Sequence, residues 1–99
     1  MMQLFGLTLP GGMQDVPPLL ASALAARMTS AATALEQGAT AAVSAGLRQD
    51  ARDFLDARRR GELRLPLGAA RRCDDTARAL LRLTADAPAL RPAERRLVA

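Results

Sequence analysis

Alanine and leucine recur at helical spacing through the first half of this 99-residue chain. Steps of three and four residues separate the members of one apolar stripe: Leu20, Leu24, Met28, Ala31, Leu35, Ala39 and Ala42. This period places them on one side of an α-helix. β-Sheets favour aromatic and β-branched side chains, whereas Phe5 and Phe54 are the only aromatic residues in the sequence. The sequence therefore predicts an all-α protein.

Local signals divide the chain into helices at about residues 17–45, 47–60 and 67–85. The segment "DVPPLL" begins the first helix, because proline suits the first helical turn. Gly61 follows three arginines, an order typical of a helix end. The proline in "ELRLPLG" favours an extended connector before the third helix. The expected fold is a helical hairpin or a small three-helix arrangement with a long alanine-rich N-terminal helix, in a single domain at residues 17–87.

Gly38, Ala42 and Gly46 are spaced four residues apart. On one continuous helix they would share a face that lets another helix pack closely. Glycine costs about 1 kcal/mol relative to alanine inside a helix, so Gly46 is equally a candidate for a kink or break. The sequence leaves open whether residues 17–60 form one helix or two.

The two ends of the chain differ from the central domain. Residues 1–16 form an apolar arm that contains Leu4, Phe5, Leu7 and Leu9. Terminal segments pack only when specific contacts hold them, so the arm either covers the first helix or stays free. Residues 88–99 are expected to be a loose C-terminal tail.

The composition leaves few groups for catalysis. Histidine, the commonest general base and metal ligand at neutral pH, is absent. Cys73 is the single cysteine, and its place on the apolar stripe of the third helix favours a packed thiol over a reactive one. No glycine-rich phosphate loop with a lysine is present. We therefore expect a protein that is not an enzyme and needs no metal or cofactor.

The sequence also contains no membrane-spanning or signal segment that we can identify. No window approaches the ~20 apolar residues that a membrane span needs. No positive charge precedes Arg27, whereas signal peptides begin with a basic segment. We expect a soluble, cytoplasmic protein.

The apolar stripe is the strongest functional lead. A chain this short buries a limited share of its surface, so part of the stripe is expected to stay open for a partner. The predicted function is a small helical interaction module that binds a protein partner or itself. The expected interface residues are Leu20, Leu24, Met28, Leu35, Gly38 and Ala42. The partner and the oligomeric state are not predictable from the sequence.

Arginine supplies all the positive side chains, and most of them lie in the second half of the chain. Six surround the connector and are candidates for contact with an acidic partner or another anion: Arg58, Arg59, Arg60, Arg64, Arg71 and Arg72. Arginines also stabilise the last turn of a helix, so these residues need no ligand to account for them. A nucleic-acid-binding protein is one alternative function.

The alanine-rich helical segment at about residues 19–58 resembles the phasins, granule-coating proteins of bacteria. The resemblance consists of composition and periodicity. It implies amphipathic helices that cover an apolar polymer surface, and it is a second alternative function. The charged segment after Arg60 departs from the phasin pattern.

Overall fold

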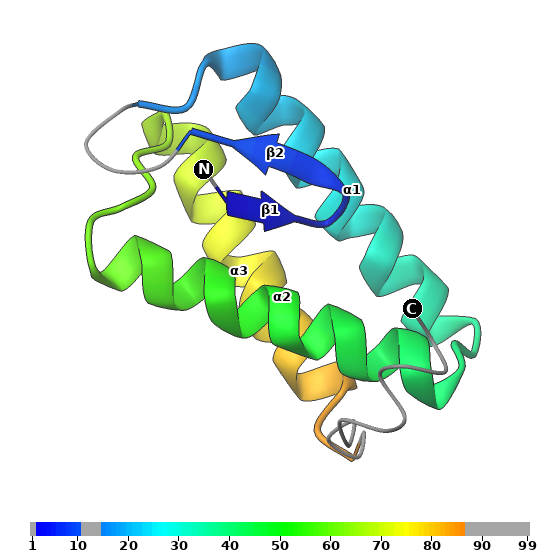
Figure 1. The fold of residues 1–99 in the computed structure, drawn as a ribbon. Helices are drawn as coiled ribbons and strands as arrows, with labels where there is room; N and C mark the ends of the chain where they lie inside the picture. The colour runs from blue at the N-terminus through cyan, green and yellow to red at the C-terminus, as the bar shows by residue number, and fades with distance from the viewer. Residues whose placement is uncertain (1, 11–14, 87–99) are drawn as a thin grey trace.

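The computed structural model describes residues 2–10 and 15–86 of the chain. These residues form β1 (Met2–Leu4), β2 (Leu7–Leu9), α1 (Pro18–Glu36), α2 (Ala41–Arg59) and α3 (Leu67–Leu83), as Figure 1 shows. The predicted small helical arrangement is confirmed, but the two-stranded sheet was not predicted. The predicted tail at residues 88–99 lies outside the described residues.

Residues 2–9 of the N-terminal arm form an antiparallel β-hairpin, with Leu4 paired to Leu7 across a two-residue turn. The turn residues Phe5 and Gly6 have φ angles of 54° and 78°, and the favoured two-residue hairpin turn requires positive φ at both positions. This backbone conformation is strained for phenylalanine. Burial of the ring and a hydrogen bond from the Phe5 amide to Asp50 hold it in place. The arm therefore packs on the helices rather than staying free.

α1 and α2 are separate helices, and the interruption lies at residues 37–40 rather than near Gly46. Gly38 has a φ of 98°, which side chains rarely allow. Thr40 then caps α2, because its hydroxyl oxygen accepts a hydrogen bond from the amide of Val43 at 3.2 Å. The prediction of one helix at 17–45 is therefore wrong, since the three-and-four spacing of the stripe runs across this loop.

Gly46 lies inside α2 and is exposed. A Cβ added there would meet nothing within 4 Å outside its own helix backbone. Gly46 thus marks neither a break nor a close approach of another helix. Because Gly38 lies in the loop, Gly38, Ala42 and Gly46 do not share one helical face.

The three arginines before Gly61 end α2 as the sequence predicts. Gly61 has a φ of 74°, its amide donates to the carbonyl of Arg58, and the amide of Glu62 donates to the carbonyl of Ala57. These two bonds form the Schellman motif, which satisfies carbonyl groups at the end of a helix. The arrangement of acids before bases and glycine therefore has a local structural cause.

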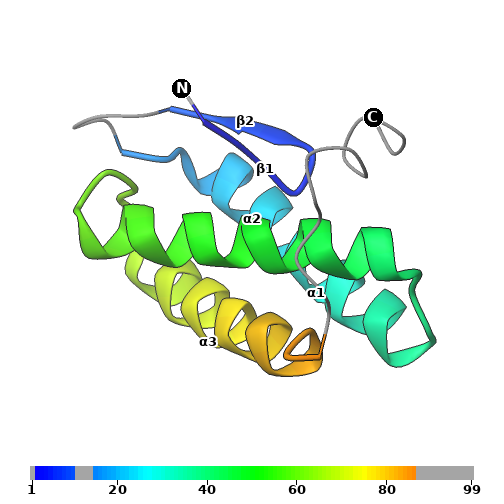
Figure 2. The ribbon, with the colours of Figure 1, turned by 60° about the horizontal axis from the view of Figure 1, so that its bottom comes forward.

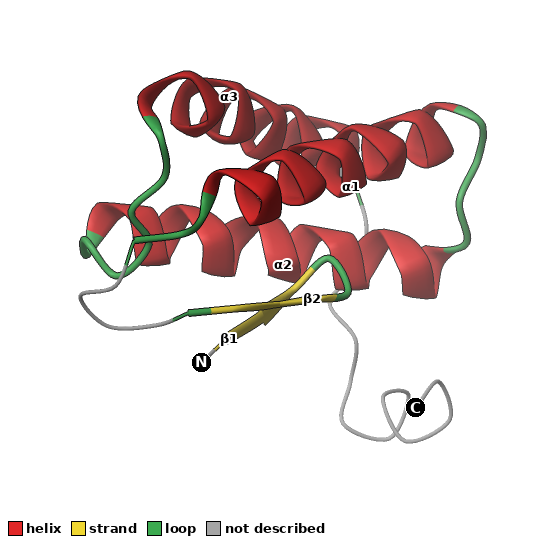
Figure 3. Cartoon of the chain, turned by 90° about the horizontal axis from the view of Figure 1, so that it is seen from above, coloured by secondary structure: helices red, strands yellow, loops and turns green. Residues whose placement is uncertain are grey.

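α1 and α3 run parallel to each other, while α2 runs in the opposite direction (Figures 1 and 3). The connector before α3 pairs with the segment before α1, where the Val16 amide donates to the Arg64 carbonyl at 2.8 Å. Both helices bury residues at spacings of three and four: Ala21, Leu24 and Met28 in α1, and Ala70, Cys73, Ala77 and Leu80 in α3. Small side chains on α3 leave room for the larger ones on α1.

The hairpin and α3 cover opposite sides of the pair formed by α1 and α2, as Figures 2 and 3 show. Leu4 and Leu9 of the hairpin belong to the same buried cluster as Leu24, Met28 and Phe54. The hairpin therefore covers a part of the apolar stripe that the sequence predicted to stay open.

Candidate interaction surfaces

The predicted interface does not form one exposed face. Leu24 and Met28 are fully buried in the core, and Leu20 and Leu35 are half-buried and pack against it. The remaining two residues lie apart from this group, Gly38 in the exposed loop and Ala42 half-buried on α2. Leu24 and Met28 cannot contact a partner in this fold, so the prediction is corrected for them. The physical reason is that the hairpin and α3 cover this side of α1.

The opposite side of α1 faces solvent and carries very little charge. Arg27 and Glu36 are the only charged residues among the 19 of α1. Five exposed residues recur on this side at spacings of three and four: Leu19, Ser22, Ala26, Thr29 and Thr33. We call these five residues the α1 outer face. Leu19 is 88% exposed and is the largest apolar side chain of the five.

The two threonine hydroxyl groups of the α1 outer face already donate hydrogen bonds within their own helix. Thr29 donates to the carbonyl of Ala25 at 2.9 Å, and Thr33 donates to the carbonyl of Thr29 at 3.2 Å. Such bonds satisfy the hydroxyl within its own helix. The α1 outer face is therefore mostly methyl groups and small side chains.

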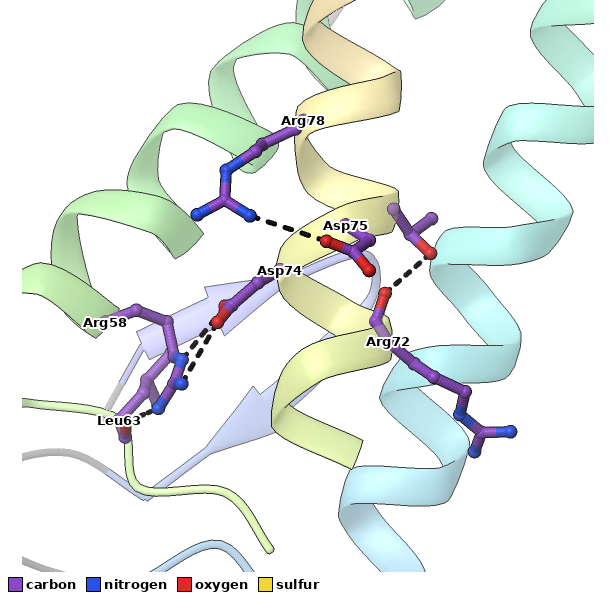
Figure 4. A network of polar contacts seen from close by, with 7 residues as sticks. Arg58, Leu63, Arg72, Asp74, Asp75 and Arg78 are labelled. Atoms are coloured by element: carbon purple, nitrogen blue, oxygen red, sulfur yellow. Dashed lines mark hydrogen bonds and ion pairs between the residues drawn. The ribbon is translucent and has the colours of Figure 1, made fainter. Parts of the chain in front are cut away.

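A groove runs along this face between α1 and α3. Its α1 wall consists of small side chains, and the residues that line it are Ser22, Ala25, Ala26, Thr29, Arg72, Asp75 and Thr76. Thr76 donates to the carbonyl of Arg72 at 2.8 Å, so this hydroxyl is also satisfied within its helix. Figure 4 shows Arg72 reaching toward the α1 side of α3. Small side chains of α1 and charged side chains of α3 therefore face each other across this groove.

Among the six predicted anion-contacting arginines, Arg58 has a structural role. Its guanidinium donates to both carboxylate oxygens of Asp74, at 3.0 and 3.1 Å, and to the carbonyl of Leu63 at 3.1 Å (Figure 4). The hydrogen bond to Asp74 raises the pKa of Arg58 further above its usual value. Arg58 thus joins the end of α2 to α3 and to the connector, and its charge is matched inside the protein.

The other five arginines are exposed and do not gather as one patch. Arg59 pairs with Asp56 and Arg60 pairs with Glu62. Three more extend from the connector and α3, namely Arg64, Arg71 and Arg72. Because Arg72 lines the groove beside α1, it belongs to a different surface from Arg58 and Arg59. The prediction of a single cluster at residues 58–72 is therefore corrected.

A second groove, between α2 and α3, was not predicted as a site. Leu55, Arg58, Arg59, Asp74 and Arg78 line it. Figure 4 shows Arg78 on the α2 side of α3, with its ion-pair partner Asp75. Helical spacing could have indicated this groove, because Asp74 and Arg78 lie four residues apart. The sequence does not reveal that α2 contributes Arg58 and Arg59 to the same groove.

A buried thiol and a half-buried carboxylate contribute to the fold. Burial raises the pKa of the Cys73 thiol, which supports the prediction of a packed cysteine over a reactive one. Burial also raises the pKa of Asp50, whose carboxylate accepts a hydrogen bond from the Phe5 amide at 3.1 Å. Asp50 thereby fastens the hairpin turn to α2. Among the described residues, no three His, Cys, Asp or Glu side chains are grouped to hold a metal ion.

Comparisons with protein-family models, curated proteins and solved structures find no match. None of the three helices is both long and apolar enough to cross a bilayer, as far as residues 2–10 and 15–86 are concerned. A function must therefore be inferred from the fold and its surfaces.

Proposed function

We propose that this protein is a small, non-enzymatic helical interaction module that pairs with a second copy of itself through the α1 outer face. The single observation that supports this proposal is an exposed helix side whose five residues bear no charge. The solvent-facing surfaces of α3 and of α2 from Arg48 onward are rich in arginine and aspartate. A side without charge is typical of a surface that another helix covers.

The cost of removing water from this face is low. The Thr29 and Thr33 hydroxyls already have acceptors within α1, so burying them leaves no donor unsatisfied. Ala26 and Ser22 are small enough for a second helix to approach closely. Leu19, 88% exposed, would lose the largest apolar area on contact.

An identical copy suits this face because the face contains no like charges that would repel each other. A partner with a charged interface would find counterparts only in Arg72 and Asp75, which line the groove beside the α1 outer face. Self-association is therefore favoured over binding to an unlike charged surface.

Light scattering over a concentration series tests the proposal. The wild-type protein is expected to form a dimer, and Ala26→Glu is expected to shift it to monomer because the substitution places like charges in the middle of the interface. Ala41→Glu is the matched control, since Ala41 is exposed at the start of α2. Circular dichroism should show that both variants keep the helical fold. A wild-type monomer at about 1 mM would refute the proposal.

A further inference from the structure

The groove between α2 and α3 is basic and lies apart from the α1 outer face. Three guanidinium groups and one carboxylate line it, and that carboxylate, Asp74, is already bonded to Arg58. The side chains that line the groove therefore carry a net charge of +2, three arginines against one aspartate, and Asp56 and Asp75 lie beside it as ion-pair partners of Arg59 and Arg78. Their ion pairs with Asp56 and Asp75 are exposed, and such pairs contribute little and yield readily to a competing carboxylate.

Helical spacing extends this positive charge along both walls of the groove. On α3, Arg71 lies seven residues before Arg78, so both are on the same side of the helix. On α2, the exposed Arg52 lies seven residues before Arg59. Arg48 reaches across to donate to the Leu81 carbonyl at 2.9 Å. One row of arginines therefore borders each side of the groove, with Asp56 between them on α2 and Asp74 and Asp75 between them on α3.

Apolar side chains lie on the same helix sides as these arginines. Leu55 lines the groove and is half-buried. Leu67, four residues before Arg71 on α3, is 90% exposed. It is the most exposed of the large apolar side chains in the described residues. Exposed leucines flanked by cations are complementary to a helix whose leucines are flanked by carboxylates.

We propose that the α2–α3 groove binds an acidic amphipathic helix of a partner protein. Leucine-type side chains of that helix would contact Leu55 and Leu67, and its aspartates or glutamates would pair with Arg59, Arg71 and Arg78. The groove lies between two antiparallel helices, so an added helix continues the packing of the bundle.

A nucleic acid fits the same surface less well. Single strands are held by aromatic side chains that stack on the bases, and both aromatic residues of this chain, Phe5 and Phe54, are buried. A phosphate backbone would also gain nothing from the exposed Leu67. The combination of leucine and arginine therefore favours a protein helix.

Fluorescence polarisation with a labelled synthetic peptide tests the proposal on the full chain. The peptide is as long as α3 and carries a leucine stripe bordered by glutamates, and a second peptide has glutamine in place of every glutamate. We expect the acidic peptide to bind with a strong salt dependence and the glutamine peptide to bind at least about tenfold more weakly.

Variants locate the binding site. The double variant Arg59→Gln and Arg78→Gln should weaken peptide binding at least about tenfold, and Leu67→Ser should weaken it about threefold or more. Arg72→Gln is the control for position, because it removes one positive charge from the α1 side of α3 and should leave binding unchanged. Circular dichroism should show that each variant is folded.

Three outcomes would overturn the proposal. The first is that the acidic peptide does not bind. The second is an equal loss of peptide binding in the double variant and in Arg72→Gln. The third is a single-stranded oligonucleotide that displaces the peptide and binds with no loss in Leu67→Ser, which would assign the groove to nucleic acid. Ala26→Glu should not change peptide binding, so failure of the proposed self-association and failure of this proposal are distinguishable.

Discussion

α1 and α2 have the same length, 19 residues, but the protein holds them by different means. α1 contains two charged residues, and within the described residues it makes no side-chain hydrogen bond to another element. α2 contains seven charged residues and is bonded to other segments through Arg48, Asp50 and Arg58. Packing alone therefore positions α1, whereas directional polar bonds also fix α2.

This difference decides which side of each helix is available to bind a partner. One side of α1 packs against the apolar core. The other side is exposed and consists mostly of small, uncharged side chains that bond to no other element of the described residues. In α2, arginine and aspartate already serve the fold at several points, so only some of its charges remain for a ligand. An exposed charge on this protein is thus a candidate binding residue only after its internal partners are known.

The largest expected effect tests whether packing holds α1. Leu24→Ala should lower the free energy of unfolding by about 3 kcal/mol, because Leu24 is fully buried and its loss leaves a cavity. Leu19→Ala on the exposed side of the same helix is the control and should change stability by less than about 0.5 kcal/mol. Urea denaturation measures both. Equal effects of the two substitutions would contradict the assignment of the inner and outer sides of α1.

An intermediate effect tests whether polar bonds hold α2. Arg58→Gln should lower the free energy of unfolding by about 1–2 kcal/mol, since it removes the two bonds to Asp74 and the bond to Leu63 at a half-buried site. Arg59→Gln, next in sequence but exposed, should lower it by less than about 0.5 kcal/mol. Thermal denaturation at matched pH and salt compares them. A larger loss of unfolding free energy in Arg59→Gln than in Arg58→Gln would contradict the assignment of Arg58 as the residue that fixes the end of α2.

The smallest effect tests where α1 ends and α2 begins. Gly46→Ala should raise the free energy of unfolding by about 0.5–1 kcal/mol, because alanine favours a helix interior and the added Cβ meets no neighbour. Gly38→Ala should lower it by about 1 kcal/mol, since the φ of 98° strains any residue with a side chain. Denaturant titration of the pair gives the sign of each effect. A loss of stability in Gly46→Ala and a gain in Gly38→Ala would place the break between the two helices near Gly46.

Several features were predictable from short-range rules. The end of α2 follows from the helix-stop chemistry at Gly61, the start of α3 follows from the conformational restriction at Pro66, and the packed state of Cys73 follows from its stripe. The loop at 37–40 was hidden because Ala39 continues the apolar spacing through it. The hairpin was missed because its turn uses Phe5, a residue that rarely adopts positive φ.

The sequence by itself determined that this chain is mostly helical, where α2 stops, and which residue types populate each helix, because periodicity, glycine and proline act over a few residues. Only the tertiary structure decided that the hairpin covers the leucines of α1, that Arg58 binds Asp74, and that α2 and α3 border one basic groove. These facts depend on contacts between residues far apart in the chain, and local spacing contains no information about which distant segment will pack there.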